Sequence, residues 1–409
     1  MKNIVMTVMN DVIHDGRVMK EARALKQAGY KVTIIGLGKE QTDYELEGIR
    51  IILAKECTIC RKILNQKHNQ KFVPRENRQK AEETRLLKYK LYTYVKGIFI
   101  LLISLSGERR ILKEIKRKKL DMIGIHCHDL NTLYVGVELK RKNKIYKLIY
   151  DSHELWTEMS GINIIVKKYY QKKERKYIKY VDSIITVSPS IAEILKTRYA
   201  LPIKPILVRN LPENSVDIQI KKNAIYKNMI KIIYIGFYLK GRGIEYVINQ
   251  IPQVMSCYKF YFRIEGNAED INNLKKLIIQ LKIEDRVEIL PFVSQTELIF
   301  EISNYDIGLL PYTNTSLNNK FCLPNKLFEY IQAGTAILAN DLPDVADILE
   351  NYKLGLCYDM DSDRSLSYVL NHKMRTQVEN FKTNSRTVSK ETLNWKNEKQ
   401  KLLDVWDTK

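Results

Sequence analysis

Histidines and carboxylates follow two short apolar segments, at the points where strands are predicted to end. His128 and Asp129 follow DMIGIHC, and His153 and Glu154 follow YKLIYDS. Histidine is suited to moving a hydroxyl proton near neutral pH. In doubly wound sheets, ligands bind at the carboxyl ends of the strands. We therefore predict that these four residues form a catalytic group. The alternative is that His153 and Glu154 belong to a helix N-cap that only shapes a cleft.

Glycines and basic residues stand where a diphosphate could bind. Lys240 and Arg242 follow the predicted strand IIYIG and open a helix, and Arg242 can hold phosphate oxygens in a bidentate manner. Gly16 follows the first predicted strand and could bring backbone N–H groups to a phosphate. Gly266 follows FYFRIE and would let the chain pass close to a base or phosphate. The alternatives are ordinary turns, with Arg17 as a helix-surface charge.

Residues of metal-binding type do not form a recognisable metal motif in the sequence. Cys57 and Cys60 form a CxxC pair, but zinc would need a second ligand pair at short spacing. The DMD segment at 359–361 is interpreted as surface. His126 stands two residues before His128, and we expect it to point to the opposite face of the strand and to be structural. No metal ligand and no cofactor are therefore expected.

Alternating strands and helices must position these residues. KNIVMTVM and KVTIIGLG read as apolar strands on either side of an amphipathic helix, and the same alternation restarts at IKIIYIGFYLKGRGIEYVI. Continuous apolar strands beside helices favour buried parallel sheets. We predict an α/β chain of two tandem Rossmann-like domains with a cleft between them. The expected limits are 1–215 and 216–390, with a linker near 212–228 and a terminal helix at 391–409.

Composition supports two globular domains and places the charge in one of them. The chain has 409 residues, of which 45% are apolar and 28% charged, so a largely disordered protein is excluded. The net charge is +21, and residues 1–215 hold 43 Lys/Arg against 23 Asp/Glu. Six cysteines do not make a disulfide framework. The longest apolar run, Gly97–Leu105, is about half of what a membrane-spanning helix needs.

Several segments, in their order and spacing, are similar to a known family. The segments are DVIHDGRVMKEARALKQAGYKVTII, HCHDLNTL, YDSHELWTE, IYIGFYLKGRGIEYVI and LPNKLFEYIQAGTAILANDLPDVADIL, followed by LNWKNEKQKLLDVW. Together they resemble the retaining nucleotide-sugar glycosyltransferases of family 4, which have GT-B architecture. The resemblance spans nearly the whole chain apart from about 55–118. In that family, the last segment is a terminal helix that crosses back to the first domain.

The resemblance implies roles for three residues of the longest segment. Glu329 matches the family glutamate that accepts hydrogen bonds from the ribose hydroxyls, and Asn325 and Lys326 become candidates to contact the donor sugar or phosphate. The sequence departs from the family at two positions. Phe237 stands where an Arg often follows the strand glycine, and Phe321 stands where many members have a second glutamate. A retaining transfer without a divalent metal is implied, with the diphosphate stabilised by basic residues.

A basic stretch suggests where the acceptor is met. Residues 55–180 hold 31 Lys/Arg against 13 Asp/Glu, and they include the apolar segment Leu91–Gly107. Basic residues flank this segment: Lys88, Lys90, Arg109, Arg110 and Lys113. A basic-flanked apolar helix is suited to lie on an anionic bilayer. We therefore expect the insertion at 55–118 to face a membrane, and the alternative is a core helix beside a solvated basic loop.

The resulting prediction is a metal-independent hexosyltransferase. It would move a sugar from a UDP- or GDP-linked donor to a glycan or lipid-linked acceptor, in cell-surface polysaccharide or glycolipid synthesis. We expect it in the cytoplasm, peripheral on the inner face of the cell membrane. The alternatives are a sugar-nucleotide epimerase of similar architecture, a catalytically silent homologue and a basic nucleic-acid-binding protein. No nucleic-acid-binding motif is recognisable, so no nucleic-acid partner is expected.

Overall fold

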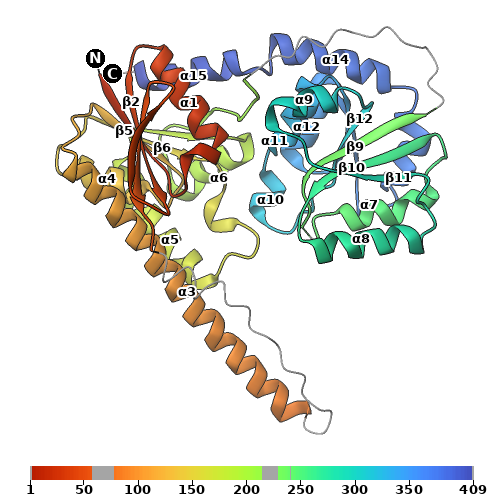
Figure 1. Ribbon diagram of the computed structural model, residues 1–409, viewed down its shortest axis with the longest axis horizontal. Coiled ribbons are helices and arrows are strands. Elements are labelled where there is room, and N and C mark those ends of the chain that lie inside the picture. The colour runs from red at the N-terminus through yellow and green to blue at the C-terminus, as the bar shows by residue number, and fades with distance from the viewer. Residues whose placement is uncertain (1, 58–77, 214–228, 240, 408–409) are drawn as a thin grey trace. The chain divides into compact units, whose positions relative to one another are not determined.

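The chain folds into two compact units. The computed structural model describes residues 2–57, 78–213, 229–239 and 241–407, without the side chains of residue 14 and of 78–90 (Figure 1). The first unit comprises Met1–Val187, Ile191–Val208 and Lys401–Lys409, and the second comprises Ser188–Ser190 and Arg209–Gln400. The domain boundary predicted near 212–228 lies largely outside the described residues.

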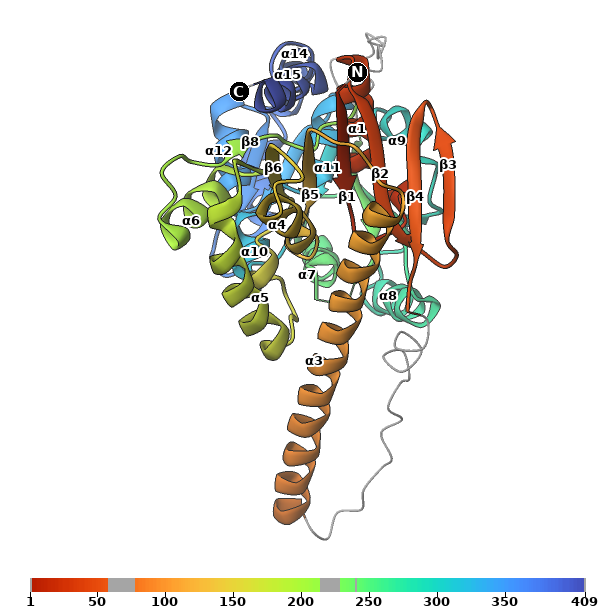
Figure 2. The same ribbon diagram turned by 90° about the vertical axis from the view of Figure 1, so that its left-hand side faces the viewer.

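The first unit is built on an eight-stranded sheet, in the order β3-β4-β2-β1-β5-β6-β7-β8. All neighbouring strands are parallel except β3 and β4 (Figure 2). The strands are β1 Asn3–Thr7, β2 Lys31–Gly38, β3 Thr42–Leu46, β4 Ile49–Lys55, β5 Gly124–His128, β6 Lys147–Ser152, β7 Ser183–Thr186 and β8 Ile206–Leu207. The helices are α1 Gly16–Gln27, α3 Arg78–Arg117, α4 Leu133–Arg141, α5 Ile164–Tyr177 and α6 Pro189–Tyr199.

Helices cover both faces of this sheet because its central strands are buried on both faces. Val5 and Ile125 pack with α3, α4 and α5 on one face. Residues of the alternate parity, such as Met6 and His126, lie on the other face with α1. The strand order reverses between β1 and β5, so the carboxyl ends of these two strands mark the switch point where ligands bind in such sheets.

Helix α3 is the main departure from a plain Rossmann domain. Figure 2 shows α3 as a single long helix. Its C-terminal part packs into the core through Ile111 and Leu112, whereas Leu91 and Leu102 are exposed. Leu91–Arg117 is long and apolar enough to cross a membrane by length and composition alone, and 17% of its most apolar stretch is buried. The uninterrupted run Gly97–Leu105 underestimates this length, because charged residues are scattered along the rest of the helix. Cys57, just before the basic stretch, is half-buried, and Cys60 lies outside the described residues.

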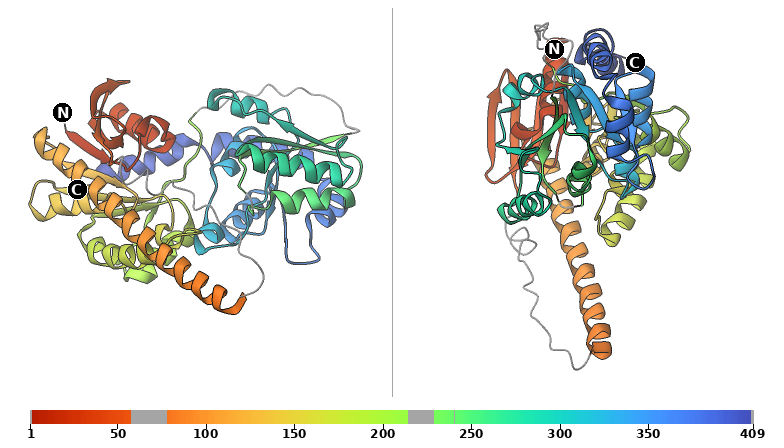
Figure 3. Two further views of the ribbon diagram at one scale, coloured as in Figure 1. Left: turned by 60° about the horizontal axis from the view of Figure 1, so that its bottom comes forward. Right: turned by 90° about the vertical axis from the view of Figure 1, so that its right-hand side faces the viewer.

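The second unit carries a six-stranded, fully parallel sheet, in the order β11-β10-β9-β12-β13-β14 (Figure 3). The strands are β9 Ile230–Phe237, β10 Tyr258–Glu265, β11 Val287–Leu290, β12 Ile307–Leu310, β13 Ala336–Asn340 and β14 Gly355–Tyr358. The helices are α7 Ile244–Gln250, α8 Ala268–Gln280, α9 Gln295–Ile302, α10 Leu317–Phe321, α11 Asn325–Gln332, α12 Pro343–Tyr352, α13 Leu366–Val369 and α14 Val378–Glu391. Helix α15, Trp395–Asp407, begins in the second unit, and its residues from Lys401 on belong to the first.

Alternation along β9 separates the two helical layers of the second unit. Ile232 and Tyr234 pack with α7 and α8 on one face, and Ile233 and Ile235 pack with α9, α11 and α12 on the other. The strand order reverses between β9 and β12. Both units are therefore Rossmann-like α/β sheets with helices on each face, as the sequence predicts, and each has its own switch point.

Candidate functional site

Three of the four predicted catalytic residues lie together at the carboxyl ends of β5 and β6. His128 Nδ1 lies 3.0 Å from His153 Nε2. The backbone N–H of His153 donates to Asp129 Oδ1 over 3.1 Å, and His153 Nδ1 lies 3.5 Å from Asp129 Oδ2. The register explains this meeting, because β5 and β6 are parallel and pair His128 with Asp151.

The turn after β5 holds Asp129 in place. Its φ of 61° lies in the left-handed region, which aspartate tolerates better than most residues. The backbone N–H of Asp129 donates to the carbonyl of Asp151 over 2.8 Å, and the Thr132 hydroxyl donates to the carbonyl of His128 over 2.8 Å. These bonds fix the carboxylate of Asp129 beside the imidazole of His153.

The two imidazoles of this group differ in charge. Burial lowers the pKa of His128 to about 3, with further lowering from the neighbouring histidines. Burial also lowers the pKa of His153, but the Asp129 and Asp151 carboxylates outweigh it and raise that pKa to about 9. At neutral pH the buried His128 is therefore uncharged. The partly exposed His153 carries a second ring proton and a positive charge. The pair can pass or hold a proton at the carboxyl ends of the strands.

Arg17 links this group to α1, which the sequence analysis did not foresee. Its guanidinium donates to both carboxylate oxygens of Asp151 over 2.9–3.1 Å and to the carbonyl of Val208 over 2.9 Å. Arg17 Nε also lies 3.0 Å from Glu21 Oε1. The interpretation of Arg17 as a helix-surface charge was wrong, because its side chain is 5% exposed. The sequence held one signal for this contact, because Glu21 stands four positions after Arg17 and residues four apart lie on the same side of a helix.

Asp151 stays ionised at the centre of this network. Burial raises its pKa, but Arg17 and His153 outweigh burial and hold the pKa well below its usual range. The opposite holds for Glu21, whose pKa is raised by burial despite the opposing effect of Arg17.

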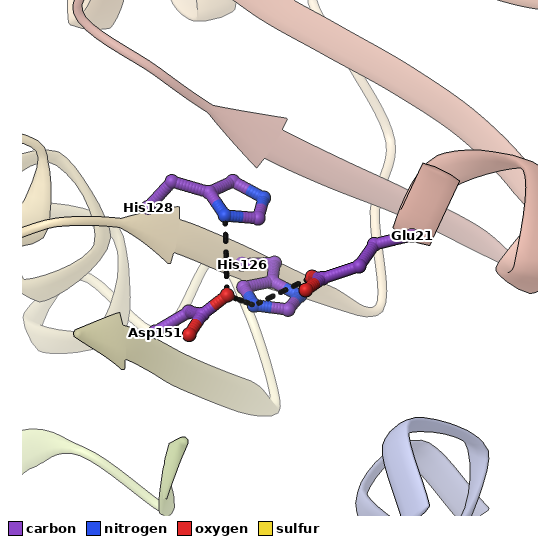
Figure 4. A group of neighbouring side chains, drawn as sticks. All are labelled: Glu21, His126, His128 and Asp151. Carbon is purple, nitrogen blue, oxygen red and sulfur yellow. Dashed lines mark ion pairs between the residues drawn. The ribbon is translucent and has the colours of Figure 1, made fainter. Parts of the chain in front are cut away.

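His126 belongs to the same network, contrary to the sequence prediction. Its ring stacks on that of His128, with centroids 4.4 Å apart and planes 12° from parallel (Figure 4). The prediction of opposite faces was wrong, because residues two apart on a strand point to the same face. Alternation along β5 thus places both imidazoles toward α1, next to Glu21.

The remaining predicted residues of the first unit are Gly16 and Glu154. Gly16 begins α1, and a Cβ at this position would meet nothing within 4 Å, so internal packing does not require a glycine there. The space above it is open to a ligand that approaches the backbone. Glu154 is exposed, and its carbonyl accepts a hydrogen bond from the Ser152 hydroxyl.

In the second unit, Lys326 lies at the carboxyl end of β9 beside Gly236. Its Nζ donates to the Tyr234 hydroxyl over 3.0 Å and lies 4.4 Å and 5.4 Å from the ring centroids of Tyr234 and Tyr312. Gly236 has a φ of 126°, and a Cβ there would lie 2.4 Å from Lys326 Nζ. A glycine is therefore needed for the lysine to reach the switch point. Within the described chain, Tyr234 is the one hydrogen-bond acceptor of this ammonium, so two donors remain for a ligand.

Glu329 and Arg242 are close enough to Lys326 to alter its charge. Burial lowers the pKa of Lys326 to about 8, Glu329 raises it, and Arg242 lowers it further. Glu329 follows Lys326 by one turn of α11 and accepts a hydrogen bond from Gln295 Nε2 over 3.4 Å. Asn325 is exposed at the start of α11, and its Oδ1 accepts from Asn210 over 3.1 Å.

The glycine-containing turns of the second unit are tightly built. Arg242 is exposed in the turn before α7, where a Cβ on Gly243 would come within 1.9 Å of the Pro311 carbonyl oxygen. A Cβ on Gly266 would lie 3.2 Å from the Tyr238 carbonyl oxygen, so this glycine lets the loops after β9 and β10 approach each other. Lys240 lies outside the described residues. Gly236, Tyr234 and Tyr312 were missed by the sequence analysis, although a glycine at the end of a strand was visible there.

The arrangement of the second unit suits an anionic ligand with hydroxyl groups. The side chains of Lys326 and Arg242 are cationic and can bind phosphate oxygens, and two N–H donors of the Lys326 ammonium remain for this purpose. The carboxylate of Glu329, one turn along α11 from Lys326, can accept hydrogen bonds from hydroxyls. The position matches the rule that ligands bind at the switch point of such sheets.

Comparisons with known proteins identify the family of the chain. Residues 17–210 match the family model described as "Glycosyltransferase Family 4", and residues 215–388 match "Glycosyl transferases group 1". An uncharacterized glycosyltransferase of Methanocaldococcus jannaschii is 24% identical over 319 residues, which cover 69% of this chain and 78% of that protein.

Solved structures share the fold over the whole chain. Sucrose-phosphate synthase from Thermosynechococcus elongatus aligns with a TM-score of 0.69 at 13% identity, covering 99% of this chain and 98% of that one. An Escherichia coli structure described as trehalose-6-phosphate bound with UDP-2-fluoro glucose aligns with a TM-score of 0.68 at 9% identity, covering 100% of both chains. With the two family models matching nearly end to end, this chain belongs to the group 1 glycosyltransferases of family 4, retaining enzymes of GT-B architecture that use nucleotide-sugar donors.

Proposed function

We propose that this glycosyltransferase moves a hexosyl group from a UDP- or GDP-sugar to a glycan or lipid-linked acceptor at an anionic membrane surface, in the synthesis of a cell-surface polysaccharide or glycolipid. The observation that carries the proposal is Lys326 at the end of β9, with Gly236 making room for it and Arg242 and Glu329 nearby. The UDP-2-fluoro glucose bound by the E. coli structure of the same fold supports a uridine donor.

The donor's parts fit different residues of the second unit. The two phosphates meet Lys326 and Arg242, whose charges stabilise the negative charge that develops on the leaving nucleoside diphosphate. The carboxylate of Glu329 accepts hydrogen bonds from the two ribose hydroxyls. Asn325 is exposed at the start of the same helix, within reach of the sugar. Gly266 borders the loop where the base lies.

We place the acceptor hydroxyl beside His153 and Asp129, at the carboxyl ends of β5 and β6 in the first unit. His153 is partly exposed and hydrogen-bonded through its backbone to Asp129, whereas His128 is buried behind it. In a retaining transfer by same-face attack, the new glycosidic bond forms as the bond to the diphosphate breaks, and the acceptor hydroxyl proton passes to the departing phosphate oxygen. The His153 and Asp129 side chains orient that hydroxyl, and Glu154 remains a predicted contact at the same edge.

Helix α3 supports an acceptor on a membrane. Its exposed apolar residues include Leu91, Tyr94 and Leu102. A groove of about 450 Å³ lies along the same helix and is lined by Leu102, Leu105, Arg109, Arg110 and Lys113, with further residues of β4 and Gln41. An apolar wall beside four cationic side chains, which outnumber the one carboxylate of Glu114, suits an anionic lipid headgroup with its acyl chain. We place the protein on the cytoplasmic side, bound peripherally through this helix.

A nucleotide panel tests the donor part of the proposal. The melting temperature of the full-length protein is measured with UDP-, GDP- and ADP-sugars at equal concentrations, because a ligand stabilises by an amount that grows with its concentration over Kd. One nucleotide class should raise the melting temperature selectively, and the same sugar should then appear on an extracted membrane lipid or glycan. Equal shifts with all three nucleotides, or none, would reject a UDP- or GDP-sugar donor.

A wash test separates peripheral binding from spanning. Membranes that carry the protein are washed with high salt and then with alkaline carbonate. Release by these washes supports surface binding through charge, since surface electrostatics are screened by salt. Retention until detergent is added would show that Leu91–Arg117 spans the bilayer instead.

A further inference from the structure

Four side chains of types that bind metal ions converge in the first unit, next to His153 and Asp129. Glu21 comes from α1, His126 and His128 from β5, and Asp151 from β6 (Figure 4). Each offers one ligand atom, and these atoms all lie within 4.8 Å of one another. None of the four residues is more than 1% exposed. Three separate elements thus aim nitrogen and oxygen donors at one buried point.

Three of the six separations between these donor atoms approach those of a coordination shell, and all six are within 4.8 Å. His126 Nε2 lies 3.8 Å from Glu21 Oε2 and 3.7 Å from Asp151 Oδ2, and His128 Nδ1 lies 3.4 Å from Asp151 Oδ2. Direct hydrogen bonds are shorter, at about 2.9 Å. Around a tetrahedral zinc ion with bonds of about 2.0–2.2 Å, donor atoms lie about 3.3–3.6 Å apart.

The hydrogen bonding of the cluster is incomplete without an ion. Within the described chain, neither ring nitrogen of His126 nor Oε2 of Glu21 takes part in a hydrogen bond, while Oε1 of Glu21 is ion-paired with Arg17 Nε at 3.0 Å. Buried polar atoms are rarely left this way, because losing water without a new partner is costly. His126 is fully buried and points at the two carboxylates, so it marks the same centre as the four-residue geometry.

The charges and the outer contacts also suit a cation. Two carboxylates face one guanidinium, and neutral imidazole is the form of histidine that ligates metals. Arg17 donates to both oxygens of Asp151 and lies beside Glu21, so it orients the two carboxylates from outside the cluster. His153 Nε2 lies 3.2 Å from Asp151 Oδ2 and 3.0 Å from His128 Nδ1, so an ion bound by these two atoms would replace their contacts with His153.

We propose that Glu21, His126, His128 and Asp151 bind a divalent transition-metal ion, with Zn²⁺ the best match. Four protein ligands and complete burial are typical of a closed, structural site. The ion would tie α1 to β5 and β6 directly under the carboxyl ends that carry His128 and His153. It positions that edge of the sheet and takes no part in the transfer step.

A zinc titration of the full-length protein without a polyhistidine tag tests the site. The protein is stripped with a chelator, dialysed and titrated with Zn²⁺ against a chromophoric zinc indicator. We expect one equivalent that competes with the indicator. Both Glu21→Gln and His126→Gln should lose it, and His372→Gln, which changes an exposed histidine of the second unit, should keep it. Equal uptake by all four proteins, or none by the wild type, would overturn the proposal.

Cobalt identifies the ligands and guards against misfolded variants. Tetrahedral Co²⁺ at this site gives visible d–d bands without a sulfur charge-transfer band, because no ligand is a cysteine. A strong sulfur band would assign the ion to cysteines and overturn the proposal. Zn²⁺ should also raise the melting temperature of the stripped wild type and of His372→Gln, but not that of Glu21→Gln. An equal rise in Glu21→Gln, once that variant is shown to be folded, would count against the site.

Discussion

Replacing Lys326 by methionine should weaken binding of the nucleoside diphosphate and spare the nucleoside. Methionine is one atom shorter than lysine but keeps an apolar chain beside Gly236, Tyr234 and Tyr312, and it removes the ammonium. Hydrogen bonds to charged groups contribute about 1.5–3 kcal/mol each. The loss of one such bond to a phosphate therefore predicts a Kd for UDP that is about 10- to 150-fold higher.

The fold should tolerate this change. Burial lowers the pKa of Lys326 to about 8, which means that the surroundings disfavour its charged form. Removing the charge thus relieves an unfavourable interaction in the ligand-free protein. The melting temperature without ligand should be unchanged or higher in Lys326→Met.

The pH dependence of UDP binding provides a second signature of the same residue. Lys326 carries its positive charge below a pKa of about 8 and loses it above. Affinity of the wild type for UDP should therefore be full below pH 8 and fall by up to tenfold per pH unit above it, whereas Lys326→Met should show a flat profile. Bound phosphate shifts the midpoint upward, because it favours the charged amine.

Isothermal titration calorimetry with UDP, UMP and uridine measures these effects. Uridine affinity should be the same in the two proteins, while UDP loses most. Equal losses for UDP and uridine, or an unchanged Kd for UDP, would refute the assignment of Lys326 to the diphosphate.

Three further predictions use the same structure. Glu329→Ala should lose about 1.5–3 kcal/mol of UDP affinity. Unlike the wild type, it should bind UDP and 2′-deoxy-UDP equally, and a retained preference for UDP would refute the assignment of Glu329 to the ribose hydroxyls. Gly236→Ala should cost about 1–2 kcal/mol of folding stability because of the positive φ, and it should also weaken UDP binding by displacing Lys326. Urea unfolding measures the stability and calorimetry measures the UDP affinity. An unchanged UDP affinity would contradict the contact between Gly236 and Lys326. Changing the three basic residues of the α3 groove within 109–113 to alanine should weaken binding to anionic vesicles by about 1 kcal/mol per residue. Sedimentation with vesicles checks this, with alanine at the exposed Lys275, Lys276 and Lys282 as the matched control; equal losses in both variants would show a nonspecific effect.

The fold could be predicted because its signal is local. Apolar strands alternating with amphipathic helices indicate parallel sheets, and residues after a strand lie at its carboxyl end whatever the rest of the chain does. For this reason His128, Asp129 and His153 were found from the sequence, as was Lys326 through its motif.

The network around Asp151 could not be predicted from local signals. Arg17 and Asp151 are 134 residues apart, and their contact depends on which side of α1 packs against the sheet. His126 could have been found, because period-two alternation places it with His128. The match of Gly236 with Lys326 is likewise a long-range contact, and its signal in the sequence is only a glycine at the end of a strand.

A crystal structure of the full-length protein soaked with UDP tests the central claim most directly. We expect the diphosphate at the carboxyl ends of β9 and β12, with an oxygen within hydrogen-bond distance of Lys326 Nζ and the ribose hydroxyls on Glu329. A diphosphate bound elsewhere on the chain, with Lys326 still directed only to Tyr234, would contradict it.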